Sequence, residues 1–413
     1  MKFSINIKRL FVFLYVLVVT ALLVLPSVKY SFTYVQTTII SIPMFAYVIL
    51  TTRSKSILKN YIQIITCFSL MALFHFVFNS RGNTSSLLNL MVTFYLCLVP
   101  FFMCRMLLDT KDYQLIKWVT IIASAMLALI MFNTFREFAD NPTVARLLAS
   151  GNVGGDEEYA QYLHNSNIGG YGFSYCIGAF IPFITSLIDR VGPKKKLIVI
   201  LVLVVTFVFC VYTQYTTLII LSVCSLFYVL ISQGKLTVKK VLFIFLLFFV
   251  IIFIKDIVLF FATNTSLKTV SVRLYDIYNI LSGGEAANSR GDLILSAFRL
   301  FMDNPIFGVD MNDAIAATVV NSSHSTFFGM LAQGGLIGLF LYYGILSIST
   351  RVIKEAVYIK YITPVYVFIF VLSILNPISH PEIFVSSFMV IPLMEFLFTH
   401  KETEYGIKKR MVG

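Results

Sequence analysis

The sequence predicts an all-α polytopic membrane protein, and both its composition and its long apolar runs support that class. Of the 413 residues, 58% are hydrophobic and only 13% are charged, whereas a soluble domain carries about 25% charged residues. The mean hydropathy of +0.86 leaves more apolar mass than a soluble core of this size can hide. These values exclude a soluble enzyme, a disordered chain and a fibrous repeat. They predict a single integral membrane domain over residues 1–413.

Apolar runs near the length that crosses a bilayer, about 20 residues, predict twelve transmembrane helices. The first run follows Lys8 and Arg9 as a signal peptide would, but no small-residue cleavage site comes after it, so we expect a span. The stretch 197–232 is too long for one helix and is interrupted by the polar residues 213–217, so it counts as two. The expected spans are residues 10–25, 32–51, 62–78, 86–104, 116–135, 169–188, 197–212, 216–232, 241–261, 326–348, 361–376 and 383–399.

The positions of Lys and Arg predict how the protein is oriented. Twelve spans place both termini on one side, and the segments on that side hold 23 of the 32 Lys and Arg residues. A basic excess marks the cytoplasmic side of a membrane protein, so we expect both termini in the cytoplasm. The net charge of +12 therefore reflects orientation, and no nucleic-acid partner is expected.

Two segments on the opposite, outer side are long enough to carry function. They are residues 136–168 and residues 262–325, the second lying between the ninth and tenth spans. Long ordered loops in compact folds are usually functional, whereas every inward loop here is short and basic. Any chemistry is therefore expected on the outer face.

The segment 262–325 contains its own helical pattern. Ser289 and Asp292 have the spacing of a capping box, which predicts a helix start. Asn304-Pro305 ends the pattern and Gly308 permits a turn. A second short helix is expected near 312–320. The apolar stripe that makes the first helix amphipathic is Ile294, Ala297, Phe298 and Phe301.

These residues resemble the O-antigen polymerase and O-antigen ligase superfamily. The run RGDLILSAFRLFMDNPIFGVD (290–310) is similar to that family's Arg-led loop helix with its Pro-x-x-Gly turn. The run HSTFFGMLAQGGLIG (324–338) is similar to the His that opens the next span, followed by Gly-x-x-Gly. Asn165-Ser166-Asn167 resembles the family's Asn-x-Asn. The twelve-span layout with its large loop before the tenth span also resembles that superfamily, and it implies a GT-C-like architecture.

The resemblance implies a glycosyltransferase of the bacterial cell membrane that needs no metal, cofactor or nucleotide sugar. Such enzymes move a glycan from an undecaprenyl-diphosphate carrier to an acceptor sugar hydroxyl, in O-antigen, capsule or exopolysaccharide synthesis. It also makes a chain-length regulator protein a candidate partner. Catalytic roles are implied for His324 and Arg290, because histidine takes up protons near neutral pH and guanidinium binds phosphate bidentately. The implied substrate-binding residues are Arg299, Arg273, Asn165, Asn167 and His164.

Simpler interpretations of the same residues stay open. His324 could be an interfacial histidine, Arg290 a solvated helix start, and Arg299 a surface charge paired with Asp292 or Asp303. The six cysteines lie in apolar stretches without metal-ligand spacing and are expected as small core residues. The run 310–313 is expected as a turn and helix cap, since its spacing does not match a metal-binding Asp-x-Asp pair.

Two other functions compete with the polymerase. The first is the ligase of the same superfamily, which transfers finished glycan to a terminal acceptor. Tyr215 stands where many members carry arginine, between the seventh and eighth spans, and this favours the polymerase. The second is a lipid-linked oligosaccharide flippase or transporter. Transporters often show two related halves and mid-membrane substrate groups, and neither is evident in this sequence.

Overall fold

The computed structural model shows an all-helical, multi-pass membrane protein. It describes residues 7–80, 82–141, 157–213, 215–232, 253–264 and 285–399, with single positions between 142 and 156 and between 265 and 284. In these ranges there is no strand. Seven described helices are long and apolar enough to cross a membrane, and four shorter apolar helices accompany them. The predicted class is therefore confirmed. The count of twelve spans stays a prediction, because residues 241–252 of the expected ninth span lie outside the described residues.

The helices follow one another with short connections. The first half of the chain forms α1 (Ile7–Val24), α2 (Pro26–Lys29), α3 (Tyr34–Thr51), α4 (Lys55–Phe74), η1 (His75–Asn79), α5 (Thr84–Thr110), α6 (Tyr113–Asp140), α8 (Glu157–Asn165), α9 (Tyr171–Gly178) and α10 (Phe180–Leu187). The second half forms α11 (Pro193–Tyr212), α12 (Thr216–Ser232), α14 (Ile254–Asn264), α16 (Glu285–Asp303), α17 (Ala314–Ser322), α18 (Thr326–Lys354), α19 (Ile359–Leu375), α20 (Pro381–Phe384) and η2 (Val385–Val390). The last helix continues from α20 through η2 to Thr399.

Polar side chains fix where several helices begin. Asp112 accepts a hydrogen bond from the backbone N–H of Leu115 at the start of α6. Asp313 does the same for Ile315 and Ala316 at the start of α17. These caps satisfy backbone donors that a helix start leaves unpaired. The expected turn and cap at 310–313 is thereby confirmed.

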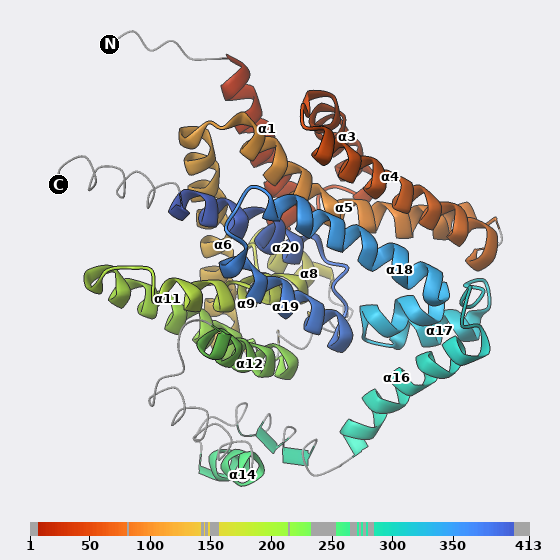
Figure 1. Ribbon diagram of the computed structural model, residues 1–413. Coiled ribbons are helices and arrows are strands. Elements are labelled where there is room, and N and C mark those ends of the chain that lie inside the picture. The colour runs from red at the N-terminus through yellow and green to blue at the C-terminus, as the bar shows by residue number, and fades with distance from the viewer. Residues whose placement is uncertain are drawn as a thin grey trace.

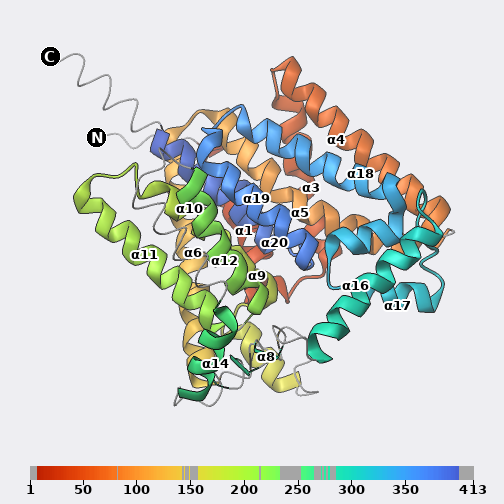
Figure 2. The same cartoon turned by 60° about the horizontal axis from the view of Figure 1, so that its bottom comes forward.

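The start of α1 and the end of the last helix lie at one end of the bundle, and α16 and α17 lie away from it (Figure 1). Figure 2 shows α8 on the side away from the termini as well. We call the first end the termini face; it includes Arg9, residues 52–54 and residues 109–112. The other end is the loop face; it includes residues 26–33, 164–170, 304–325 and 376–382. The two ends are described separately below.

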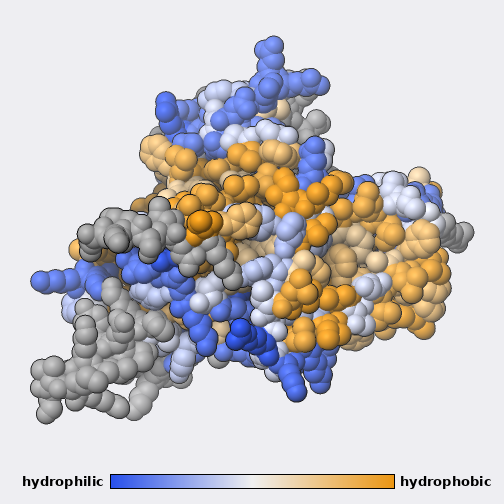
Figure 3. Space-filling view, turned by 90° about the horizontal axis from the view of Figure 1, so that it is seen from above, coloured by the Kyte–Doolittle hydropathy of each residue, from blue (hydrophilic) through white to orange (hydrophobic). Residues whose placement is uncertain are grey.

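The core gathers around α5 and the last helix, which are the two most buried of the membrane-length helices. α20 packs against α5 and α9, while α18 packs against α4, α16 and α19. Outward-facing side chains are apolar: Leu197 and Phe340 are each 72% exposed. Figure 3 shows a broad apolar area with hydrophilic residues along its margins. This distribution is typical of a surface that lipid covers.

A buried ion pair holds each end of the last helix. Lys29 Nζ lies 2.5 Å from Glu382 Oε1 at the loop face. Arg190 Nη1 lies 2.5 Å from Glu395 Oε2 toward the termini face, and its guanidinium also sits 3.9 Å from the centroid of the Tyr361 ring. All four charged side chains are at least nine-tenths buried.

Candidate functional site

A cavity beside His324 opens among the helices of the loop face. It has a volume of about 210 Å³. His324 is exposed and lies between α17 and α18 with φ of +50°. Ser325 fixes this connection, because its hydroxyl accepts from Phe328 N–H at the start of α18 and donates to the Ile374 carbonyl at 2.7 Å. The residues that line the cavity are Met71, Leu90, Thr93, Phe94, Cys97, Val320, Asn321, Ser323, His324, Ser325, Thr326, Gly329, Met330, Gln333, Tyr342, Pro377 and Ser379.

The lining of this cavity contains both aromatic and polar side chains. The rings of Phe94 and Tyr342 stack with centroids 4.8 Å apart, and both side chains are buried. Asn321, Ser323 and Gln333 add amide and hydroxyl groups to the lining. Such a lining combines apolar area with groups that donate and accept hydrogen bonds, as small-molecule sites do.

The turn after α16 is inserted into a break in α18. Gly335 departs from helical geometry inside α18, with φ of 59° and ψ of −159°. The backbone N–H of Leu336 then donates to the Pro305 carbonyl at 2.9 Å, and Val309 N–H donates to the Ala332 carbonyl at 3.0 Å. A Cβ on Gly335 would lie 2.4 Å from the Ile306 carbonyl oxygen. Only glycine fits there, since both the backbone conformation and the close approach exclude a side chain.

Asn79, at the end of η1, also forms hydrogen bonds to the turn that follows α16. Its amide Nδ2 donates to the carbonyls of Phe307 at 3.0 Å and Val309 at 3.1 Å, and also to that of Gln333. Gly308 has φ of +73°, so the expected turn is present. The two motifs around 290–310 and 324–338 are therefore in direct backbone contact, and the second of them lines the His324 cavity as far as Gln333.

Two of the three predicted arginines, Arg290 and Arg299, belong to α16. This helix begins at Glu285, so Ser289 lies inside it, and the expected capping box at Ser289 is wrong. Ala297 is fully buried and Arg299 is exposed, so the helix is amphipathic as expected. Arg290 belongs to α16, roughly 13 Å from Arg299 along its axis, but its side chain lies outside the described residues, as does the whole of Arg273.

His164 and Asn167 lie together at the end of α8. The His164 ring stacks on Tyr30 with a centroid distance of 3.7 Å and an interplanar angle of 12°. Burial lowers the pKa of His164, and the neighbouring Lys29 charge lowers it further. Asn167 accepts hydrogen bonds from the Ser27 N–H at 3.1 Å and the Ser27 hydroxyl at 2.8 Å. Its carbonyl oxygen is therefore occupied in holding α2.

Asn165 is exposed at the same helix end. Its side chain makes no hydrogen bond to another described residue, so it is available to a ligand that approaches from the loop face. His164, Asn165 and Asn167 thus meet at one place. His324 lies in a separate cavity.

A buried charged cluster that the sequence analysis missed lies between these two places. Lys29 and Glu382 form its ion pair, and the second carboxylate oxygen, Glu382 Oε2, is buried with no hydrogen-bond partner among the described residues. Burial opposes the charge on Lys29, but the Glu382 carboxylate raises the Lys29 pKa above its ordinary value. Burial lowers the pKa of His380, which lies 5.3 Å from the Tyr171 ring.

The segment 376–382 connects this cluster to the His324 cavity. Pro377 and Ser379 line the cavity, while Glu382 contacts Lys29. Asn376 Nδ2 donates to the Tyr175 hydroxyl at 2.6 Å. A row of polar groups, which we call the polar band, therefore runs from His164 past the buried Lys29–Glu382 pair to His324.

Two further observations concern groups that could take part in chemistry. Among the described residues, no group of three or more His, Cys, Asp or Glu side chains is placed to hold a metal ion. The six cysteines are free; four are buried, while Cys224 is exposed and Cys67 is partly exposed. The ring of Tyr215 stacks near that of Tyr175 with a centroid distance of 6.2 Å and meets the Tyr171 ring edge-on at 5.5 Å.

No protein-family model, curated protein or solved structure matches this chain. The functional assignment therefore depends on the residues and geometry of the loop face.

Proposed function

We propose that this protein polymerises undecaprenyl-diphosphate-linked oligosaccharide repeat units on the outer face of the bacterial cell membrane. The observation that carries the proposal is the cavity beside His324, which is lined by the first part of α18, the segment that also binds the turn after α16. The lining supplies a histidine together with amide and hydroxyl groups, and the arginine-bearing α16 packs against α18, one of the helices that line the cavity. These are the groups that a metal-independent transfer from a lipid diphosphate needs.

In this proposal His324 accepts the proton of the acceptor hydroxyl as that oxygen attacks the anomeric carbon of the donor. The bond from that carbon to the diphosphate oxygen breaks, and its electron pair leaves with the diphosphate. Arg290 and Arg299 stabilise this growing negative charge, since guanidinium offers paired donors to phosphate oxygens. The exposed position of Arg299 on α16 allows it to reach a headgroup at the membrane surface.

The size of the cavity fits an acceptor end and excludes a whole repeat unit. At about 210 Å³ it is smaller than the roughly 300–1,000 Å³ of sites that enclose a drug-sized ligand. The rest of a lipid-linked oligosaccharide would lie along the open loop face. His164 and Asn165 would contact it there, at the far end of the polar band.

The first test is mass spectrometry of lipid-linked glycans from a strain that lacks this gene. Single repeat units on undecaprenyl diphosphate, accessible at the outer face, are the expected result. Long lipid-linked polymer would instead indicate the ligase. Single units retained at the inner face would indicate a flippase, and either result would overturn the polymerase proposal.

The second test replaces His324 without disturbing its backbone. Asparagine tolerates positive φ better than most residues, so His324→Asn removes the base and keeps the turn. We expect polymer formation to fall by about 10²–10⁴-fold, the range attributed to general-base catalysis. Thr318→Asn, an exposed change on α17 outside the cavity, is the matched control. Full polymer formation by His324→Asn would refute the role of His324.

The third test concerns the arginines. Arg290→Lys and Arg299→Lys retain the charge but lose the paired donors, so we expect both to reduce polymer yield. Arg351→Lys, at the opposite end of the bundle in the last turn of α18, should leave the yield unchanged. Equal yields from all three variants would exclude bidentate phosphate binding by α16.

A further inference from the structure

A second, larger cavity lies at the termini face, far from His324. Its volume is about 980 Å³. It is formed where α1, the α3–α4 connection and the α5–α6 connection meet. Its charged lining residues are Arg9, Arg53, Asp109, Lys111 and Asp112.

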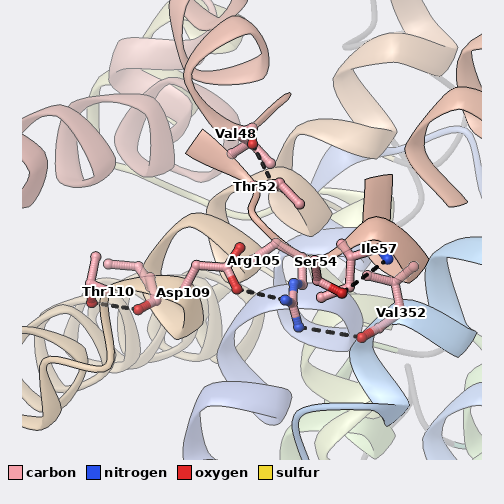
Figure 4. A network of polar contacts seen from close by, with 9 residues as sticks. Val48, Thr52, Ser54, Ile57, Arg105, Asp109, Thr110 and Val352 are labelled. Carbon is pink, nitrogen blue, oxygen red and sulfur yellow. Dashed lines mark hydrogen bonds and ion pairs between the residues drawn. The ribbon is translucent and has the colours of Figure 1, made fainter. Parts of the chain in front are cut away.

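Both acidic groups in this cavity are already neutralised by arginines. Asp112 is bound by Arg9 through two contacts, Nε to Oδ2 at 2.9 Å and Nη2 to Oδ1 at 3.0 Å. Asp109 is bound by Nη2 of the buried Arg105 at 2.6 Å. Figure 4 shows Arg105 reaching both Asp109 and the Val352 carbonyl of α18. The acids therefore stabilise the walls and leave no excess negative charge.

Two cations remain without an ion-pair partner among the described residues. Arg53 and Lys111 are both exposed at the rim of the cavity. The hydroxyls of Thr51 and Thr52 in the lining already donate to the Tyr47 and Val48 carbonyls. The Ser54 hydroxyl accepts from the Ile57 N–H and keeps its proton for a ligand. The rim therefore offers positive charge and hydrogen-bond donors together, which is the chemistry that recognises a phosphate group.

Below the rim the walls are apolar. Val12 and Leu115 are both buried, and Ile57 and Met106 belong to the same wall. Leu50, at 84% exposure, extends the apolar surface outward from the rim. A free phosphate would use only the rim, whereas a molecule with an anionic head and a hydrocarbon tail would use both parts.

We infer that this cavity binds one anionic phospholipid from the leaflet at the termini face, with its phosphate between Arg53 and Lys111. Basic pockets between transmembrane helices commonly take anionic headgroups. The acyl chains lie against the apolar wall and leave toward the bilayer past Leu50. The lipid would join α1, α3 and α6, since residues from all three helices line the cavity. This inference is independent of the polymerase proposal, because the two sites occupy opposite ends of the bundle.

Native mass spectrometry of the purified full chain tests the inference. The protein in detergent is offered equal amounts of phosphatidylglycerol and phosphatidylcholine of the same chain lengths. Each neighbouring cation strengthens the binding of an anionic headgroup about fivefold. Two cations therefore predict that the protein retains one phosphatidylglycerol, with a roughly thirtyfold preference over phosphatidylcholine. Equal retention of the two lipids would overturn the inference.

Matched variants locate the preference. Arg53→Gln with Lys111→Asn removes both charges, and asparagine tolerates the positive φ of 52° at position 111. We expect this double variant to retain the two lipids equally. Lys194→Gln with Lys195→Gln removes the same charge from exposed positions at the start of α11, outside the cavity, and should keep the preference. A preference that survives the first double variant would refute the site.

Inorganic phosphate distinguishes the two sources of a phosphate group. If millimolar phosphate leaves phosphatidylglycerol bound, the lipid is the ligand, as inferred. If phosphate displaces the lipid completely, the rim alone accounts for binding and the lipid assignment is wrong. Thermal unfolding with each lipid gives an independent measure, since a ligand that binds only the folded state raises the unfolding temperature.

Discussion

Replacing Gly335 with alanine tests the contact between the α16 turn and the broken helix α18. Its φ of 59° and ψ of −159° lie in a region that essentially only glycine occupies, and forcing another residue there costs about 1–3 kcal/mol. The new Cβ would also lie 2.4 Å from the Ile306 carbonyl oxygen and 2.8 Å from Gly308 N. Relieving such crowding costs about 1–3 kcal/mol more. We therefore expect Gly335→Ala to reduce the free energy of unfolding by about 2–6 kcal/mol.

The assay is thermal unfolding of the purified protein in detergent, followed by intrinsic fluorescence. Gly344, in the same helix, has open space where its Cβ would be built, so Gly344→Ala should be neutral or stabilise by up to about 1 kcal/mol. Gly308→Ala should behave like Gly335→Ala, because its Cβ would lie 2.2 Å from the Gln333 carbonyl oxygen. Equal unfolding midpoints for Gly335→Ala and Gly344→Ala would refute the reasoning.

Three other predictions follow from contacts at the loop face. Lys29→Met should destabilise the fold by about 3–5 kcal/mol because it strands a buried carboxylate, and adding Glu382→Gln should recover much of that loss; a double variant no more stable than the single one would contradict this. Asn79→Leu should cost about 1–3 kcal/mol because the carbonyls of the α16 turn lose their shared donor, and an unchanged unfolding temperature would argue against it. His164 has a lowered pKa when folded, so it contributes stability above its unfolded value of about 6.5 and loses that contribution as the pH falls through the folded value. His164→Phe keeps a ring against Tyr30 but cannot take up a proton, so it should flatten the fall in stability below about pH 6.5. Identical pH profiles of the free energy of unfolding would disprove the effect.

The sequence was sufficient to predict the helices and several of their ends. Long apolar runs impose helices in a bilayer because every backbone group must be satisfied within the segment. Asp313 was predictable as a helix cap and Gly308 as a turn residue, because both roles depend only on the residue type and its close neighbours in the sequence. The start of α16 was not, because Ser289 has the right spacing for a cap while the helix begins at Glu285.

The long-range contacts of the candidate site could not be read from the sequence. The helical break at Gly335 depends on a turn that lies about 30 residues earlier in the chain. Lys29 and Glu382 are 353 residues apart, so no local pattern connects them. One available signal was overlooked: the mostly apolar last helix carries Glu382 and Glu395, and ionisable residues in membrane segments are functional candidates.

The ion pairs at the two ends of the last helix have a consequence for how the protein is made. Lys29 is synthesised 353 residues before Glu382, and Arg190 is synthesised 205 residues before Glu395. At about 5–20 residues per second, Lys29 waits roughly 20–70 s for its partner and Arg190 roughly 10–40 s. Throughout that interval both cations must remain hydrated at the bilayer surface, because burying either without its carboxylate is costly. The helices that carry them therefore cannot reach their final packed positions. The arrival of residues 381–399 therefore completes the assembly, and a nascent chain that stops earlier would present two uncompensated cations to the machinery that removes unfinished membrane proteins.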